Sequence, residues 1–206
     1  MNADRVCMFP VHFENGVLFF SEGRSGLETD SWRKSAKYDS AQILRTKQND
    51  ILIAKPDAHA DCKAIFEPMT DQEMRNVPGI KFDIHRYEDT MPRGLPVAFT
   101  TIWANKTYCM CVVKGNNNMR VEFQERDAPR RIDGPTSDVI FIKTPFSEGD
   151  GQYFMFETAL EKGYFLAFEK KENGHAKRLI VKKKEAMDEV DESIKINHSP
   201  FPLQRQ

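Results

Sequence analysis

The sequence predicts an all-β protein, and three observations support this fold class. Short apolar runs recur at close intervals along most of the chain, separated by Gly, Pro, Asn and Asp. Asn173-Gly174 separates two of these runs, residues 164–168 and 179–181, and supplies the positive φ that a tight hairpin turn needs. No segment keeps the helical period for more than one or two turns. A closed fold of paired strands is therefore expected.

The first 30 residues predict a separate hairpin followed by a connector. Residues 6–13 and 17–20 each fit a short strand, and Asn15-Gly16 lies between them as a turn. An isolated hairpin is only marginally stable, so we expect this one to lean on the domain downstream. Residues 21–31 are small and polar with two glycines, which is typical of an exposed, protease-sensitive connector.

The main domain is expected to contain about twelve strands. Residues 80–85 alternate apolar and polar side chains, as a strand with one wet face does, whereas residues 139–142 are continuously apolar and should be covered on both faces. The expected strands are 40–45, 50–54, 64–67, 80–87, 96–103, 107–113, 119–125, 138–143, 153–157, 164–169, 177–183 and 193–197.

Helical signals are short. Thr70 and Glu73 form a capping-box pattern over one or two turns, and residues 185–190 predict another turn. After Asn197 the chain has two prolines and no pattern, so residues 198–206 are expected to be a disordered tail. The predicted organisation is a leading segment at 1–30, one domain at 31–197 and this tail.

Charge and apolar patterning exclude several classes of protein. The 30 basic and 31 acidic residues give a net charge of −1, which does not favour nucleic acid or acidic lipid as partners. Residues 1–30 hold five acids and two bases, a net of −3, so the remainder carries −1 − (−3) = +2. No run approaches the roughly 18 apolar residues of a membrane span. The N-terminus also lacks the pattern of a secretory signal peptide.

The sequence shows no catalytic apparatus. Phosphate-binding glycine loops, nucleophile elbows and acid–base signatures are absent from it, so we expect no enzyme and no cofactor. Cys109 and Cys111, two apart on one strand face, predict thiols rather than a disulfide or a zinc site. The basic run at residues 177–184 fits an edge strand with a wet face, and a heparin site is the alternative.

Four ordered blocks carry a resemblance to a known family. FETALEKGYFLA at residues 156–167 resembles the signature of the interleukin-1 cytokine family, and FEPMTD (66–71), PRGLPV (92–97) and TSDVIFIK (136–143) resemble its segments in its order. The likeness covers residues 27–197. It implies a β-trefoil, three units of four strands, although no internal repeat is visible and a β-sandwich fits the strand count nearly as well.

The resemblance also implies that the connector contains a protease cleavage site. Leu27, Glu28, Thr29 and Asp30, followed by small Ser31, resemble a caspase cleavage site at the place where precursors of this family are cut. Such proteases bind an extended loop and hold the aspartate carboxylate with bidentate arginines, which this connector would allow. The resemblance implies a cytoplasmic precursor whose segment 1–30 is removed, and a monomeric cytokine that is secreted without a signal peptide.

Surface recognition is the activity that the resemblance implies. The partners would be two immunoglobulin-like receptor chains and a soluble decoy protein. Met69 and Asp71 match contacts for the primary receptor, Arg93 and Leu95 match contacts shared with the decoy, and Asp138 matches a co-receptor contact. Lys34 and Arg45 match basic contacts on the first strands.

Three alternatives stay open at this point. The chain could be another cytokine of the same family, a heparin- or sugar-binding trefoil, or a protease inhibitor on the same fold. Three departures from the family pattern leave the class intact but put receptor cross-reactivity between species in doubt. Glu88 replaces a lysine, and Asn49 and Asn173 stand near positions where acids are expected, Asn173 beside an insertion.

Overall fold

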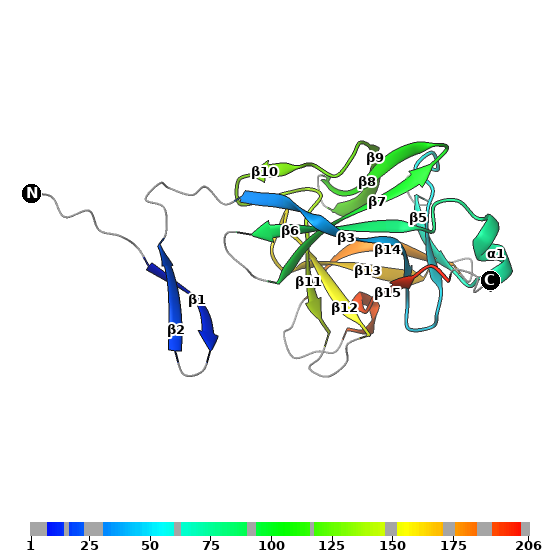
Figure 1. The fold of residues 1–206 in the computed structure, drawn as a ribbon. Helices are drawn as coiled ribbons and strands as arrows, with labels where there is room; N and C mark the ends of the chain where they lie inside the picture. The colour runs from blue at the N-terminus through cyan, green and yellow to red at the C-terminus, as the bar shows by residue number, and fades with distance from the viewer. Residues whose placement is uncertain are drawn as a thin grey trace, which may run out of the picture.

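The computed structural model describes residues 8–14, 17–22, 31–59, 63–89, 94–115, 118–146, 152–170, 176–184 and 191–202. Figure 1 shows a barrel of strands with the short helix α1 (Asp71–Asn76) beside it and a two-stranded hairpin at the N-terminal end.

The hairpin consists of β1 (Met8–Glu14) and β2 (Val17–Glu22). The strands of the barrel and its attachments are β3 (Ser31–Arg45), β4 (Ile51–Ala54), β5 (Ala64–Glu67), β6 (Phe82–Asp89), β7 (Leu95–Trp103), β8 (Lys106–Lys114), β9 (Met119–Glu125), β10 (Arg131–Asp133), β11 (Phe141–Pro145), β12 (Phe154–Thr158), β13 (Tyr164–Lys170), β14 (Lys177–Lys183) and β15 (Asn197–Pro200). Two short helices complete the fold, α1 (Asp71–Asn76) and η2 (Glu192–Ile194).

The pairing of the strands closes on itself. Strands β3, β4, β5, β14, β13, β12, β11 and β7 follow one another in one sheet, and β6 pairs with both β7 and β3. The β8–β9 hairpin extends from β7, while β10 and β15 attach to β3. A sheet that returns to its first strand is a barrel, so the β-sandwich alternative is wrong.

The N-terminal hairpin forms as expected. Met8 pairs with Glu22 and Glu14 with Val17 in an antiparallel register. Among the described strands, β1 and β2 pair only with each other, in a sheet separate from the barrel, and Figure 1 shows them apart from it. The expected support from the main domain therefore does not take the form of strand pairing.

The first barrel strand is much longer than expected. The sequence predicted a connector up to Ser31 and a strand only from residue 40, but β3 begins at Ser31. Trp32 explains the difference: its side chain is only 1% exposed, and its backbone lies between Ile132 of β10 and Asp89 of β6. One large buried aromatic thus fixes the start of a strand that otherwise looks polar.

The C-terminal expectation is wrong in part. Residues 193–197 were expected to be a strand and 198–206 a disordered tail. Instead, η2 lies at Glu192–Ile194, and β15 pairs with β3 in the register Asn197 to Arg45. Phe201 N–H donates to the Ala41 carbonyl at 2.8 Å, which continues the pairing with β3. Backbone hydrogen bonds along the open edge of β3 hold this segment, and they need no apolar sequence pattern. Residues 203–206 lie outside the described residues.

The late hairpin and the capping box are confirmed. β13 pairs with β14 from Tyr164 opposite Lys183 to Lys170 opposite Lys177, while the Asn173-Gly174 turn itself and the predicted turn at 185–190 lie outside the described residues. Thr70 and Glu73 form both hydrogen bonds of a capping box at the start of α1. Next to α1, Gly79 has a φ of +76° and its position leaves no room for a side chain, since a Cβ there would lie 2.1 Å from the Ala54 oxygen.

The core fills the barrel with aromatic side chains. The Phe99 ring lies 5.6 Å from Phe141 and 5.3 Å from Phe156, and all three are fully buried. Burying each such side chain contributes about 1.5–3 kcal/mol. A second cluster around Trp32 includes Ala98, Cys109 and Cys111, which lie on the opposite face of β7 and β8 from the main core. A third contains Met74 of α1 with five isoleucines (Ile43, Ile51, Ile53, Ile65 and Ile80). The strands that carry the surface residues are therefore supported by a closely packed core.

Candidate functional site

The residues implied by the family resemblance lie on the outside of the barrel and are dispersed over it. Lys34 and Arg45 lie at opposite ends of β3, Met69 and Asp71 at the start of α1, and Leu95 at the start of β7. Asp138 precedes β11. Arg93 and the cleavage residues Leu27 to Asp30 lie outside the described residues, whereas Ser31 is the first residue of β3.

Over the residues that the structure describes, no three His, Cys, Asp or Glu side chains gather so as to hold a metal ion. None of the helices described there is long and apolar enough to cross a membrane.

The first surface lies around the start of α1. Arg45 Nη1 donates to Asn49 Oδ1 at 2.8 Å, so the asparagine in place of an acid still holds the arginine. Asp71, the first residue of α1, is exposed, but Met69 is half-buried and packs on the isoleucine cluster beneath. We expected Met69 to be an exposed apolar anchor, but only part of its side chain is exposed for contact with a partner.

A pocket of about 460 Å³ opens beside these residues. It is lined by Gln48, Asp50, Pro68, Phe168, Lys170 and Lys177. Lys177 Nζ lies 2.5 Å from Asp50 Oδ2 and 3.0 Å from Gln48 Oε1, and the lysine is only 7% exposed. We call this hollow the Lys177 pocket.

The sequence prediction for this lysine is wrong. Residues 177–184 were expected to form an edge strand with a wet face, but β14 lies between β13 and β5, so it is not an edge. Lys177 and Leu179 share the inward face of β14, and both are buried. The alternation of Lys177, Leu179 and Val181 carried this signal, but a lysine at the end of a basic run is normally taken as exposed.

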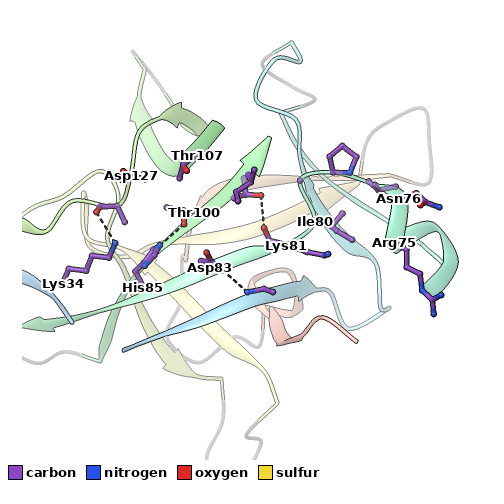
Figure 2. A pocket seen from close by; sticks show the side chains of 17 residues that line it. Lys34, Arg75, Asn76, Ile80, Lys81, Asp83, His85, Thr100, Thr107 and Asp127 are labelled. Atoms are coloured by element: carbon purple, nitrogen blue, oxygen red, sulfur yellow. Dashed lines mark hydrogen bonds between the residues drawn. The ribbon is translucent and has the colours of Figure 1, made fainter. Parts of the chain in front are cut away.

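A second surface is the groove drawn in Figure 2. It has a volume of about 550 Å³ and runs from Lys34 and Asp127 to Arg75 and Asn76 of α1, over a floor that includes His85. The groove therefore joins the Lys34 end of the barrel to the α1 surface along one continuous path. One candidate contact, Lys34, lies at one end of the groove, and Arg75 and Asn76 in the last turn of α1 lie at the other.

The floor of this groove is fixed by hydrogen bonds. A ring nitrogen of His85, Nε2, lies 2.8 Å from Thr100 Oγ1, and Asp83 Oδ1 accepts from the Ala41 N–H at 2.9 Å. Lys34 Nζ donates to the Ala128 carbonyl at 3.4 Å. Burial lowers the pKa of His85 below its ordinary value, and the Lys34 charge acts in the same direction.

Two exposed apolar side chains lie at this groove. Ile102, at the end of β7, is 64% exposed and lines it, and Tyr38, 54% exposed, stacks on His85 with ring centroids 5.7 Å apart. Large apolar side chains left in water beside charged ones are the composition of binding surfaces. Neither residue was selected from the sequence, because Tyr38 stands alone in a polar stretch and Ile102 belongs to the apolar run predicted as strand 96–103.

A third surface surrounds Leu95, which is 36% exposed and pairs with Lys143 of β11. Lys143 Nζ lies 3.8 Å from the centroid of the Phe154 ring and 2.5 Å from His198 Nε2. Burial lowers the pKa of Lys143 and lowers that of His198 to about 4. Sequence analysis missed these partners because they come from distant strands.

A fourth surface carries Asp138, which forms an ion pair with Arg126 at 2.5 Å. Below this pair lie Cys109 and Cys111, which are free and fully buried, as predicted for structural thiols. Burial raises the thiol pKa to about 12 for Cys109 and to about 11 for Cys111. Such thiols stay protonated and are poor nucleophiles.

Comparison with known proteins gives these surfaces their context. The family model described as Interleukin-1 / 18 matches residues 72–194. Interleukin-18 of Gallus gallus is 36% identical over 197 residues, 95% of this chain and 94% of that protein. Interleukin-18 of Homo sapiens is 28% identical over 84% of this chain and 83% of that protein.

Solved structures show the same fold. The crystal structure of the chicken cytokine interleukin 1 beta superposes with a TM-score of 0.55 at 17% identity, covering 82% of this chain and 99% of that one. The closed all-β barrel and this likeness show a β-trefoil fold. Together with the family match and the interleukin-18 relatives, the fold defines the molecule as a β-trefoil cytokine. The chain belongs to the interleukin-1/18 family.

Proposed function

We propose that the protein is the precursor of an interleukin-18-like cytokine that signals by bridging two immunoglobulin-like receptor chains, the interleukin-18 receptor alpha and beta chains. The observation that carries the proposal is the continuous groove that joins Lys34 to the last turn of α1 along the barrel. A partner lying along this path meets the candidate contact Lys34 at one end and Arg75 and Asn76 of α1 at the other.

The proposed surfaces divide between the partners. The α1 surface, with Arg45, Met69 and Asp71, is assigned to the alpha chain, and the Arg126–Asp138 pair to the beta chain. Leu95, with Arg93, is assigned both to the receptor and to a soluble interleukin-18-binding decoy protein. Exposed apolar anchors ringed by charge support this assignment, because such residues carry most of the binding energy of an interface.

Activation is proposed to follow cleavage by an inflammatory caspase after Asp30. The cut would leave Ser31 as the new N-terminus, directly ahead of Trp32, so the whole of β3 would stay in the product. The precursor would be cytoplasmic, and the product would leave the cell without a signal peptide.

The segment 1–30 is proposed to hinder the receptor until it is removed. Lys34 lies opposite Tyr87 in the uncleaved chain, so β3 already has its barrel register, and the proposed effect is steric rather than a change of pairing. Residues 23–30 can span roughly 26–29 Å when extended. That reach, with the negative charge of the segment, supports a hairpin that sweeps over the basic Lys34 end of the groove.

Two measurements test the proposal. Incubation with inflammatory caspases should give a product that begins at Ser31, read by N-terminal mass spectrometry. That product should bind both receptor ectodomains more tightly than the intact Asp30→Ala protein does. Equal binding by the two proteins would show that segment 1–30 does not hinder the receptor.

The heparin alternative has weaker support. In the basic run, Lys177 is buried against Asp50, Lys182 pairs with Asp191 at 2.7 Å, and Arg178 pairs with Glu169. These acids neutralise much of the positive charge that a sulfated sugar would need. Retention on heparin that is lost when Lys182 to Lys184 are neutralised would restore this alternative.

A further inference from the structure

The Lys177 pocket contains a buried ion pair that the fold does not need. Lys177 points inward from β14 beside Leu179, and its side chain and that of Asp50 are only 9% and 11% exposed. Thr46 also holds Asp50, since its hydroxyl oxygen accepts from the Asp50 N–H at 3.2 Å. A buried pair is seldom more stabilising than apolar side chains of the same volume, so its presence at the floor of a pocket calls for another role.

The pair leaves hydrogen-bonding capacity at the pocket floor. Lys177 Nζ has three N–H groups, and the described side chains supply two oxygen acceptors, one from Asp50 and one from Gln48. Its remaining neighbour is the Phe168 ring, whose centroid lies 5.2 Å away. An acceptor that enters the pocket can therefore bind Lys177 without displacing either partner.

Phe168 and Pro68 form an apolar part of the pocket wall, and Gln48 and Lys170 are polar lining residues beside it. The Phe168 ring packs edge-on against Phe66 at 5.8 Å, which holds it in place, and Pro68 lies among the lining residues. An aromatic side chain that enters the pocket buries apolar surface and makes ring contacts there. A charged guest gains little from Lys177 itself, because Asp50 already neutralises that lysine at 2.5 Å.

We infer that this pocket receives a tyrosine side chain from a loop of the primary receptor chain, with its hydroxyl bound to the Lys177–Asp50 pair and its ring lying against Phe168. The inference rests on the proposed function and names the chemistry of one contact within it. The position agrees, since Gln48 precedes Asn49, the partner of Arg45, and Pro68 precedes Met69. The phenol is neutral, both accepts and donates a hydrogen bond, and is enriched in interface hot spots.

The test uses a pocket variant that keeps its fold and a matched control on the same hairpin. The double change Asp50→Leu with Lys177→Met replaces the pair by apolar side chains without leaving one charge alone. The control is Glu169→Gln with Arg178→Gln, which removes the ion pair one residue further along both strands. Thermal unfolding of each variant confirms that it folds.

Binding is measured to the ectodomain of the same organism's interleukin-18 receptor alpha chain, with both intact and caspase-treated protein. The pocket variant should bind at least tenfold more weakly than the wild type, and the control within about twofold. Equal binding by pocket variant and control would overturn the inference while leaving the proposed function standing. Failure of the wild type itself to bind in either form would refute the proposed function.

A receptor-free arm separates these outcomes. N-acetyl-tyrosinamide is titrated into the full chain while NMR signals of Lys177 and Gln48 are followed, with N-acetyl-phenylalaninamide as the probe that lacks the hydroxyl. The tyrosine probe should shift both signals at several-fold lower concentration than the phenylalanine probe. In the double variant, which lacks Lys177, it should leave the Gln48 signal unshifted. Identical responses to the two probes would contradict the role of the hydroxyl.

Discussion

Lys143 donates a hydrogen bond from its Nζ to the Nε2 of His198 at 2.5 Å, which joins β11 to the last strand of the chain. The other ring nitrogen of His198, Nδ1, lies 3.1 Å from Gln42 Oε1 and donates to it. Because Nε2 accepts from an ammonium group, the imidazole must be neutral. The attachment of β15 therefore depends on a histidine that stays unprotonated, which has a consequence for stability at low pH.

Stability should fall as the pH drops below 6.5. The pKa of His198 is lowered to about 4 in the fold by burial and by Lys143, whereas the unfolded chain takes up the proton near 6.5. The unfolded state is thus favoured progressively from pH 6.5 down to pH 4, and the loss levels off below that. Since the ring is partly exposed, the loss is roughly 2 kcal/mol.

Urea unfolding at pH 7.5, 6, 5 and 4 measures this loss. His198→Gln removes the titrating group and should flatten the profile in this window. A residual slope of the same sign is expected from His85, whose pKa is also lowered by burial. A His198→Gln profile as steep as that of the wild type would contradict the assignment.

Trp32 should be the most important residue at the start of β3. Its side chain is 1% exposed in the cluster with Tyr87 and Val139, so Trp32→Ala should cost about 3–5 kcal/mol. Tyr38→Ala, on the same strand but 54% exposed, should cost about 1 kcal/mol or less. Thermal unfolding should show a melting temperature lower by roughly 10 °C for the tryptophan variant. Similar melting temperatures for both variants would refute the anchoring role.

The paired thiols should be unreactive in the folded protein. Burial raises the pKa of Cys109 to about 12 and that of Cys111 to about 11, so neither forms a thiolate at pH 8. With Cys7 and Cys62 replaced by serine, Ellman's reagent should release its chromophore slowly from native protein and for two thiols in guanidinium chloride. Rapid release for one thiol under native conditions would mean that the strand pair opens.

The Lys177–Asp50 pair predicts a non-additive effect on stability. Lys177→Met alone leaves the Asp50 carboxylate buried without its partner, and should cost about 3–5 kcal/mol. Adding Asp50→Leu should recover most of that loss. Chemical unfolding of both single variants and the double variant measures the coupling, and additive losses would show that the pair is solvated.

Local sequence signals predicted the structural elements whose formation depends on residues close to them in the chain. β5, β9 and β14 have the expected bounds, and the Thr70–Glu73 capping box forms, because strand alternation and capping act within a few residues. β10 and β15 escaped prediction, since each is short, polar and held by pairing with β3 from a distant part of the chain.

The residues of the candidate site divide in the same way, into those that the sequence indicated and those that only the fold brings together. The family resemblance brought out Lys34, Arg45, Asp71 and Leu95, all on the surface at strand or helix ends. Lys177 with Asp50, and Lys143 with His198, are separated by 127 and 55 residues, so only the closed barrel brings them together. No spacing rule in the sequence marks such pairs.

Sedimentation velocity of the caspase-treated protein with both receptor ectodomains is the most direct test of receptor bridging. We predict that a complex with one copy of each component forms after the cut at Asp30, and that uncut Asp30→Ala protein at the same concentration forms much less of it. Sedimentation of the cleaved protein as a free monomer in the presence of both ectodomains would contradict the proposed function.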